Sequence, residues 1–292
     1  MIDLEIILTA VFIAWACALV GSFLVTREMA MVGDAIAHAV LPGIVLAYLI
    51  SGGRDSLWML TGACLAGVFV TLCIEWVQKK ARVQSDAAIG ISYTFLFAIG
   101  VILVSKYGQT VDLDQDCVLY GEIAYVPLDR WMLGGLDMGP RQTWIGLGLF
   151  TGLSVLIFRG FRALTLTSFD PSYAATLGIS VAVWHYALMG AVSLTTVVSF
   201  ESVGAILVVA LVVIPPATAY LFAKTIKNMI LLALGFSTTM VVSGYYVSAW
   251  LDVSISGSMA TTGLVQFLLV MGLKPLLIQS EKIPSHGLKS KG

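Results

Sequence analysis

The sequence predicts an all-α polytopic integral membrane protein with eight or nine transmembrane helices. Of its 292 residues, 59% are hydrophobic and only 11% are charged, whereas ordinary soluble domains carry roughly 25% charged residues. The apolar residues gather in long uncharged stretches, and a helix needs roughly 20 such residues to cross a bilayer. These observations exclude a soluble globular protein. The net charge of −1 leaves no basic surface for a polyanion, so no nucleic-acid partner is expected.

Eight stretches contain no Asp, Glu, Lys or Arg, and a ninth is interrupted only by Asp34. In chain order, the nine stretches cover residues 6–26, 29–53, 56–74, 87–105, 142–158, 171–200, 202–223, 228–251 and 253–273. A transmembrane barrel would need short segments of alternating hydrophobicity, which the sequence lacks. We expect one transmembrane domain over residues 1–280 and a polar tail over residues 281–292. The 30-residue stretch 171–200 leaves the choice between eight and nine spans open.

Charges on the connections predict the orientation of the chain. Most of the 16 basic residues fall on connections of one side, among them Lys79, Arg162 and Lys224, and ten of the 17 acidic residues fall on the other side. Basic residues are enriched in cytoplasmic connections. We therefore expect an extracytoplasmic N-terminus and a cytoplasmic C-terminal tail.

Asp34 lies inside an apolar stretch, where an ionised carboxylate costs at least about 2.5 kcal/mol. His38 follows four residues later, so the two side chains project from one face of a helix. If the helix starts near Arg27, a rise of about 1.5 Å per residue places both near mid-bilayer. A carboxylate beside an imidazole suits a divalent transition metal. The alternative is an Asp–His hydrogen bond that locks a helix interface.

Glu201 is the second acid between apolar stretches, and it is a further candidate metal ligand. The competing interpretation places it at the outer interface, capping the N-terminus of the next helix, where a carboxylate is favoured. Pro215 and Pro216 are predicted to kink that helix. His185 has no acid three or four residues away, so we interpret it as an interfacial or packed histidine. The acidic segment 112–122 lacks the spacing of a calcium-binding loop and predicts a solvated loop with an undetermined relation to metal.

A short helix is predicted from Asp170 to Gly178. Asp170 suits the N-cap, Pro171 suits the first helical position and Gly178 suits the C-terminal exit. Such a helix can be a plain connector. It can also be a rigid element through which a cytoplasmic motor moves the membrane domain, with the small side chain of Ala174 allowing close contact with a groove.

Four segments carry a resemblance to a known family: Val32–Gly43, Tyr120–Ile123, Phe169–Pro171 with the helix that follows, and Val203–Pro216. Together they resemble the membrane permease subunit of ABC-type manganese, zinc and iron uptake systems. The resemblance implies a bacterial plasma-membrane permease that pairs with a second permease subunit, either an identical copy or a close homologue. It also implies an extracytoplasmic metal-binding protein that delivers the metal and a separate cytoplasmic ABC ATPase that drives transport.

The resemblance also implies roles for particular residues. Asp34 and His38 match the intramembrane metal ligands of the family, and the segment from Asp170 to Gly178 matches its coupling helix. The metal is then a transported substrate, manganese before iron or zinc, and no cofactor is permanently bound. The chain contains no G-x-x-x-x-G-K-[ST] motif, so it is expected to be a transport subunit and not an enzyme. A proton-coupled secondary transporter remains the alternative function.

Overall fold

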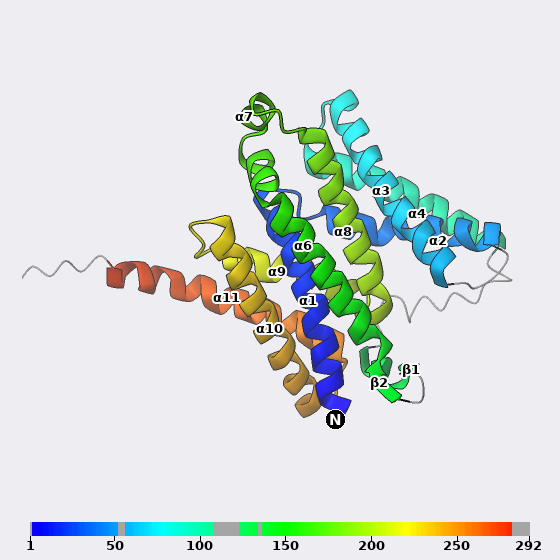
Figure 1. Cartoon of the computed structure of the whole chain (residues 1–292), viewed down its shortest axis with the longest axis vertical. Helices are drawn as coiled ribbons and strands as arrows, with labels where there is room; N and C mark the ends of the chain where they lie inside the picture. The colour runs from blue at the N-terminus through cyan, green and yellow to red at the C-terminus, as the bar shows by residue number, and fades with distance from the viewer. Residues whose placement is uncertain (1, 52–55, 108–122, 134–135, 282–292) are drawn as a thin grey trace, which may run out of the picture.

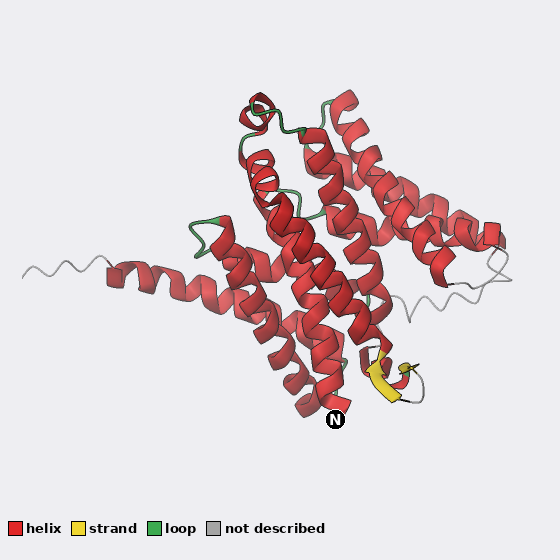
Figure 2. Cartoon of the chain, viewed as in Figure 1, coloured by secondary structure: helices red, strands yellow, loops and turns green. Residues whose placement is uncertain are grey.

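The computed structural model describes residues 2–51, 56–107, 123–133 and 136–281. Over these ranges the chain is a bundle of helices with one short pair of strands (Figures 1 and 2). The long helices are α1 (Ile2–Thr26), α2 (Val32–Ser51), α3 (Ser56–Ala81), α4 (Ser85–Tyr107), α6 (Arg141–Phe169), α8 (Val181–Val203), α9 (Ala205–Tyr220), α10 (Ile226–Leu251) and α11 (Ile255–Glu281). The smaller elements are the 3-10 helix η2 (Ile123–Leu128), the strands β1 (Arg130–Leu133) and β2 (Leu136–Pro140), and the short helix α7 (Pro171–Thr176).

The predicted fold class is confirmed. Among the described residues, eight helices are long and apolar enough to cross a membrane, namely α1, α2, α3, α4, α6, α8, α10 and α11. The ninth apolar helix, α9, has 16 residues, which at about 1.5 Å per residue is about 24 Å long. A bilayer core is about 30 Å thick. The choice between eight and nine spans therefore depends on how this short helix is counted.

Three helices continue well beyond the uncharged stretches, and one of them is α11, which ends at Glu281 although its stretch ends at residue 273. The third stretch ends at residue 74, but α3 continues to Ala81. The fifth ends at residue 158, but α6 continues to Phe169 and includes Arg159 and Arg162. A charge does not end a helix, since a charged side chain near its end can reach water or a partner. In α3, Lys79 pairs with Glu75 one turn earlier, with 2.9 Å between Nζ and Oε2.

The helices form two groups that meet at α8. Helix α1 is the most enclosed span and packs against α6, α8, α9 and α10, whereas α2, α3 and α4 pack on one another (Figure 1). Helix α8 packs against α1 and α6 on one side and against α2 and α3 on the other. The α1–α2 connection therefore passes from one group to the other.

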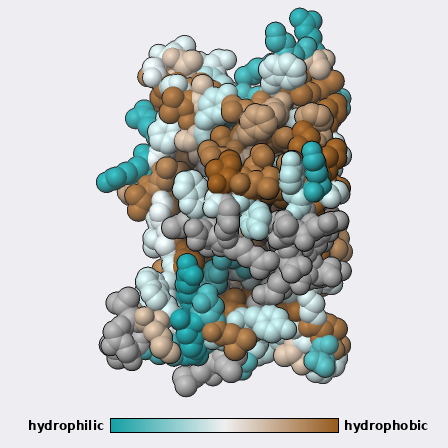
Figure 3. Space-filling view, turned by 90° about the vertical axis from the view of Figure 1, so that its right-hand side faces the viewer, coloured by the Kyte–Doolittle hydropathy of each residue, from teal (hydrophilic) through white to brown (hydrophobic). Residues whose placement is uncertain are grey.

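The two ends of the bundle carry different small elements. Helix α7 lies at the top of Figure 1, and the N-terminus lies near the β1–β2 hairpin at the bottom. We call these the α7 end and the hairpin end. Figure 3 shows hydrophobic side chains gathered over the upper part of the side that α2, α3 and α4 occupy, with hydrophilic side chains toward both ends. Leu65, Phe69 and Phe95 are exposed members of α3 and α4.

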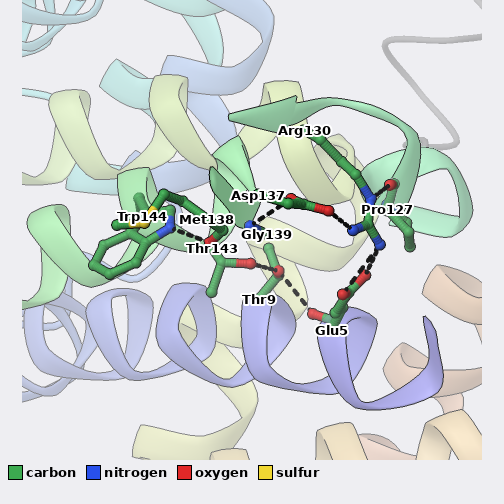
Figure 4. A network of polar contacts seen from close by, with 9 residues as sticks. All are labelled: Glu5, Thr9, Pro127, Arg130, Asp137, Met138, Gly139, Thr143 and Trp144. Atoms are coloured by element: carbon green, nitrogen blue, oxygen red, sulfur yellow. Dashed lines mark hydrogen bonds and ion pairs between the residues drawn. The ribbon is translucent and has the colours of Figure 1, made fainter. Parts of the chain in front are cut away.

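A polar network that the sequence did not predict fixes the hairpin to α1 (Figure 4). Arg130 of β1 donates to both carboxylate oxygens of Glu5 at 3.2 Å, pairs with Asp137 of β2 and donates to the Pro127 carbonyl at 3.2 Å. The Gly139 N–H and the Arg130 guanidinium hold the pKa of Asp137 below its ordinary value. The hairpin is thus tied to α1 and η2 by charge-assisted hydrogen bonds.

The same network continues into α6. The Trp144 indole N–H donates to the Met138 carbonyl at 2.8 Å, and the Thr9 and Thr143 hydroxyl oxygens lie 2.6 Å apart. These contacts join the hairpin, the first turns of α6 and α1 into one unit (Figure 4).

Candidate functional site: an acid and an imidazole on helix α2

A tight turn sets the position of Asp34. Helix α1 ends in a Schellman motif, in which the Met29 N–H donates to the Leu24 carbonyl at 2.9 Å and the Glu28 N–H donates to the Val25 carbonyl at 3.2 Å. Glu28 takes the left-handed position that glycine usually fills, with φ of 57°. The expected helix start near Arg27 was therefore wrong. Helix α2 begins after this turn, so Asp34 lies in its first turn, where the helix dipole favours a carboxylate.

The predicted pairing of Asp34 with His38 is present. Asp34 Oδ1 lies 3.6 Å from His38 Nε2, and the side chains are 30% and 42% exposed. Two ligand atoms that each lie about 2.1 Å from one ion in a tetrahedral arrangement are about 3.4 Å apart. The pair therefore has nearly the spacing required to hold one metal ion between its oxygen and its nitrogen.

Helix α4 supplies an aromatic wall behind His38. The imidazole stacks on Tyr93, with ring centroids 5.6 Å apart and planes 26° apart. Phe97, one turn further along α4, meets the imidazole edge-on at 5.6 Å. These contacts restrict the rotation of the ring and leave Nε2 directed at Asp34. Neither aromatic residue was singled out from the sequence, because their helix is far from α2 along the chain.

Helix α2 is held against α3 at very short range. A Cβ atom at Gly43 of α2 would lie 2.5 Å from the Gly62 carbonyl oxygen and from the Ala66 Cβ of α3. A Cβ atom at Gly62 would lie 2.5 Å from the Ala47 Cβ. The small residues are four apart on each helix, the spacing that lets two membrane helices pack backbone to backbone. The helix that carries Asp34 and His38 is thus fixed to its neighbour.

Glu201 does not join the pair within one chain. It lies in the last turn of α8 with an exposed side chain. In the described part of the chain, no three His, Cys, Asp or Glu side chains are grouped closely enough to hold a metal ion. The capping interpretation was wrong, because the N-cap of α9 is Gly204. That residue has φ of 79° and ψ of 162°, a conformation essentially restricted to glycine.

The short helix after Asp170 is present as α7. The Asp170 side chain accepts a hydrogen bond from the Tyr173 N–H at 2.8 Å, Pro171 is the first helical residue, and Gly178 follows the helix with φ of 76°. Ala174, however, is fully buried against the chain itself. The expectation that its side chain meets a partner was wrong, and the exposed surface of α7 is formed by neighbours such as Tyr173 and Ala175.

His185 has polar partners that sequence spacing did not reveal. Its Nε2 lies 2.5 Å from Glu75 Oε1 of α3, and its Nδ1 lies 3.2 Å from Nη1 of Arg27. The interpretation as a packed histidine is incomplete, because the acid comes from a helix more than a hundred residues earlier. The sequence did carry one signal for these contacts, because Arg27 and Glu75 each lie at the edge of an apolar stretch, where a charged side chain needs a partner or water. The acidic segment 112–122 lies outside the described residues.

Comparison with known proteins identifies the family to which the chain belongs. The chain matches the ABC 3 transport family over residues 3–274. It is 46% identical over 255 residues to the manganese transport system membrane protein MntD of Bacillus subtilis, covering 87% of this chain and 86% of that one. It is 41% identical over 272 residues to the zinc transport system membrane protein TroD of Treponema pallidum, covering 93% and 74%.

Solved structures agree with the helical fold. The chain is similar to PsaBC from Streptococcus pneumoniae, solved in complex with Fab, with a TM-score of 0.76, 30% identity, and coverage of 95% of this chain and 94% of that one. An inward-facing structure of a metal-chelate type ABC transporter shares the fold, with a TM-score of 0.63 at 17% identity. Since the family match covers nearly the whole bundle, the chain belongs to the ABC 3 transport family and is a multi-pass membrane permease.

Proposed function

We propose that the chain is the permease subunit of an ATP-driven importer of a divalent transition metal, with manganese as the first candidate and iron or zinc next. The Asp34–His38 pair carries this proposal, since its 3.6 Å spacing suits two ligands of one ion. The relatives named for manganese and zinc transport support the substrate class. An oxygen and a nitrogen ligand accept several metals of this row, so the metal is a matter for measurement.

The exposure of the pair supports a second permease subunit. Ionisable side chains in membrane helices face a bundle interior, a water-filled cavity or a partner and avoid lipid. Asp34 and His38 are 30% and 42% exposed on a single chain, and the described part of one chain groups only these two ligands at the site. A second copy or a close homologue, related by a two-fold axis, would bring two more. Four protein ligands and two waters give the six-coordinate environment that manganese prefers, in which adjacent ligands about 2.1 Å from the ion lie about 3.0 Å apart. Asp34 Oδ1 and His38 Nε2, now 3.6 Å apart, would therefore move closer together on binding manganese.

Energy for transport is proposed to come from a separate ABC ATPase that binds α7. Tyr173 of α7 is 52% exposed, and Leu177, which directly follows the helix, is 47% exposed. The α7 end is then cytoplasmic, together with the polar tail 281–292, and the N-terminus and the hairpin end face outward in the bacterial plasma membrane. An extracytoplasmic metal-binding protein would deliver the ion at the hairpin end.

Metal uptake by vesicles that contain the complete transporter tests the site. Asp34→Asn and His38→Ala each remove one ligand, so uptake of radiolabelled manganese should fall to background while insertion and pairing persist. Asp86→Asn is the matched control, because Asp86 is an exposed acid in the first turn of α4. Uptake at the wild-type rate by both site variants would refute the proposal.

A pair of neighbouring alanines tests the role of α7. Ala175 is exposed and Ala174 is buried, so Ala175→Arg should reduce co-purification of the ATPase without changing the stability of the permease. Ala174→Arg should instead destabilise the permease, because it places a guanidinium in a filled apolar position. Normal ATPase binding by Ala175→Arg would show that this part of α7 is not the docking surface.

A further inference from the structure

Arg27 connects the end of α1 to the ends of two other helices. Its Nε donates to the Ser168 hydroxyl at 2.9 Å and its Nη2 donates to the Thr167 hydroxyl at 3.0 Å, both in the last turn of α6. Its Nη1 lies 3.2 Å from His185 Nδ1 in the second turn of α8. The two hydroxyls donate onward to the Leu164 carbonyl. The guanidinium thus joins three helices through three separate hydrogen bonds.

The contacts of His185 define how the hydrogens are arranged. Arginine has donors only, so Nδ1 of His185 accepts from Arg27 and Nε2 carries the hydrogen that it donates to Glu75 Oε1 at 2.5 Å. The other oxygen of Glu75 accepts from the Tyr186 hydroxyl at 3.0 Å and from Lys79 at 2.9 Å. Because each polar atom of the His185 ring and the Glu75 carboxylate has a partner, the arrangement resists small displacements of its members.

This group of residues holds the two helices that flank α7. Ser168 lies two residues before Asp170, which caps α7, and His185 lies in the helix that follows α7. A displacement of α7 therefore reaches Arg27 through α6 and through α8. Only one residue, Asp170, separates α6 from α7. No flexible loop therefore lies between the two helices to absorb a displacement of α7.

The same group reaches the metal-binding helix by two routes. Arg27 directly precedes the hydrogen-bonded turn at Glu28, and α2 starts four residues after that turn residue. Glu75 belongs to α3, whose Gly62 is in backbone contact range of Gly43 in α2. The first route is a short hydrogen-bonded turn, and the second is a single helix, α3, that packs directly on α2, so the group has two structural connections to α2.

We propose that Arg27, Glu75 and His185, here called the Arg27 network, transmit the movement of α7 to the Asp34–His38 pair. They are positioning residues, because none of them touches the metal pair. The inference rests on the proposed function, since it assumes that α7 receives force and that α2 binds metal. It assigns a transport role to three charged or polar residues that the metal site and α7 leave unexplained.

The test uses the complete transporter in vesicles and two variants of the network. Arg27→Gln removes the charge and the guanidinium fork, and His185→Phe retains a ring that can neither accept nor donate. We measure manganese binding, basal ATP hydrolysis and manganese transported per ATP hydrolysed. Binding and basal hydrolysis should stay near wild-type values, while transport per ATP should fall about tenfold, within the usual range of coupling between sites. Arg159→Gln, on an exposed position of α6, should leave all three quantities unchanged.

The measurements distinguish a role in coupling from a purely structural role. A purely structural role would lower folded protein, binding and transport together and leave transport per ATP constant, and that result would overturn the inference. If Arg27→Gln does not insert, Arg27→Lys serves in its place, since lysine keeps the charge but not the fork. Wild-type values of manganese transported per ATP in both Arg27→Lys and His185→Phe would also overturn the inference. Loss of metal binding in Asp34→Asn, measured in the same vesicles, shows that the proposed metal site itself still stands.

Discussion

Substitution of Gly62 by alanine tests the packing that holds α2, the helix that carries Asp34 and His38. The added Cβ would lie 2.5 Å from the Ala47 Cβ and 2.6 Å from the Gly43 carbonyl oxygen. Carbon atoms in ordinary contact lie about 3.5 to 4.0 Å apart, so α2 and α3 must separate by about 1 Å. Forcing an extra methyl group into a packed interface costs about 1 to 3 kcal/mol.

Alanine is intrinsically more favourable than glycine in a helix, and this stabilisation opposes the steric cost at Gly62. A control variant measures the stabilisation separately. Alanine is favoured over glycine by about 0.8 to 1.0 kcal/mol in a helix interior. Gly152 lies inside α6, and a Cβ at that position meets nothing within 4 Å. Gly152→Ala therefore shows the preference alone, and the difference between the two variants isolates the steric cost. We expect Gly62→Ala to be less stable than Gly152→Ala by about 1 to 3 kcal/mol.

Unfolding of the purified permease by titration of mild detergent micelles with a denaturing detergent gives both free energies. Manganese uptake is measured in parallel, and it should fall in Gly62→Ala because α2 carries Asp34 and His38. Equal stability of the two alanine variants, within about 0.5 kcal/mol, would show that the helices are not in backbone contact and would refute the reasoning.

Two further predictions concern the turn before α2 and the hairpin. Glu28→Gly should keep the unfolding free energy within about 0.5 kcal/mol of wild type, because relief of the positive φ offsets the added freedom of the unfolded chain. Glu28→Val should lower the unfolding free energy by more than about 1 kcal/mol in the same detergent titration, because a β-branched side chain is strongly disfavoured at positive φ. The Gly139 N–H and Arg130 keep the pKa of Asp137 below its ordinary value of 3.8. The stabilisation by ionised Asp137 is thus complete above that value and is lost as the pH falls below it. Tryptophan fluorescence should report an acid transition that Asp137→Asn lacks, and identical profiles would contradict this assignment.

The spans could be predicted because the bilayer imposes a length and a composition on them. The same criterion failed at the ends of α3, α6 and α11, since it treats any charged residue as a boundary. Glu75 is instead paired within α3, and α6 continues for eleven residues beyond the uncharged stretch. Helix α7 was predictable for a local reason, because an N-cap and a proline act within one turn.

Contacts between distant helices could not be predicted in this way. The spacing of four residues places Asp34 and His38 on one face, and that inference needs only helix geometry. The aromatic wall of Tyr93 and the pairing of His185 with Glu75 depend on which helices pack together. The direction of Ala174 likewise depends on packing, because a six-residue helix has no amphipathic pattern long enough to show which side is buried.

The geometry of the pair limits what one chain can do with a metal ion. An oxygen and a nitrogen 3.6 Å apart can hold an ion between them, but two ligands leave at least two of its positions to other groups. Glu201 does not fill them, because no third acid, histidine or cysteine is grouped with the pair in the described part of the chain. Ligands supplied by a second subunit would be present only while the two subunits are in contact. If two α2 helices meet in this way, a movement that separates them would release the ion, and the proposed role of the Arg27 network is to pass movement of α7 to α2.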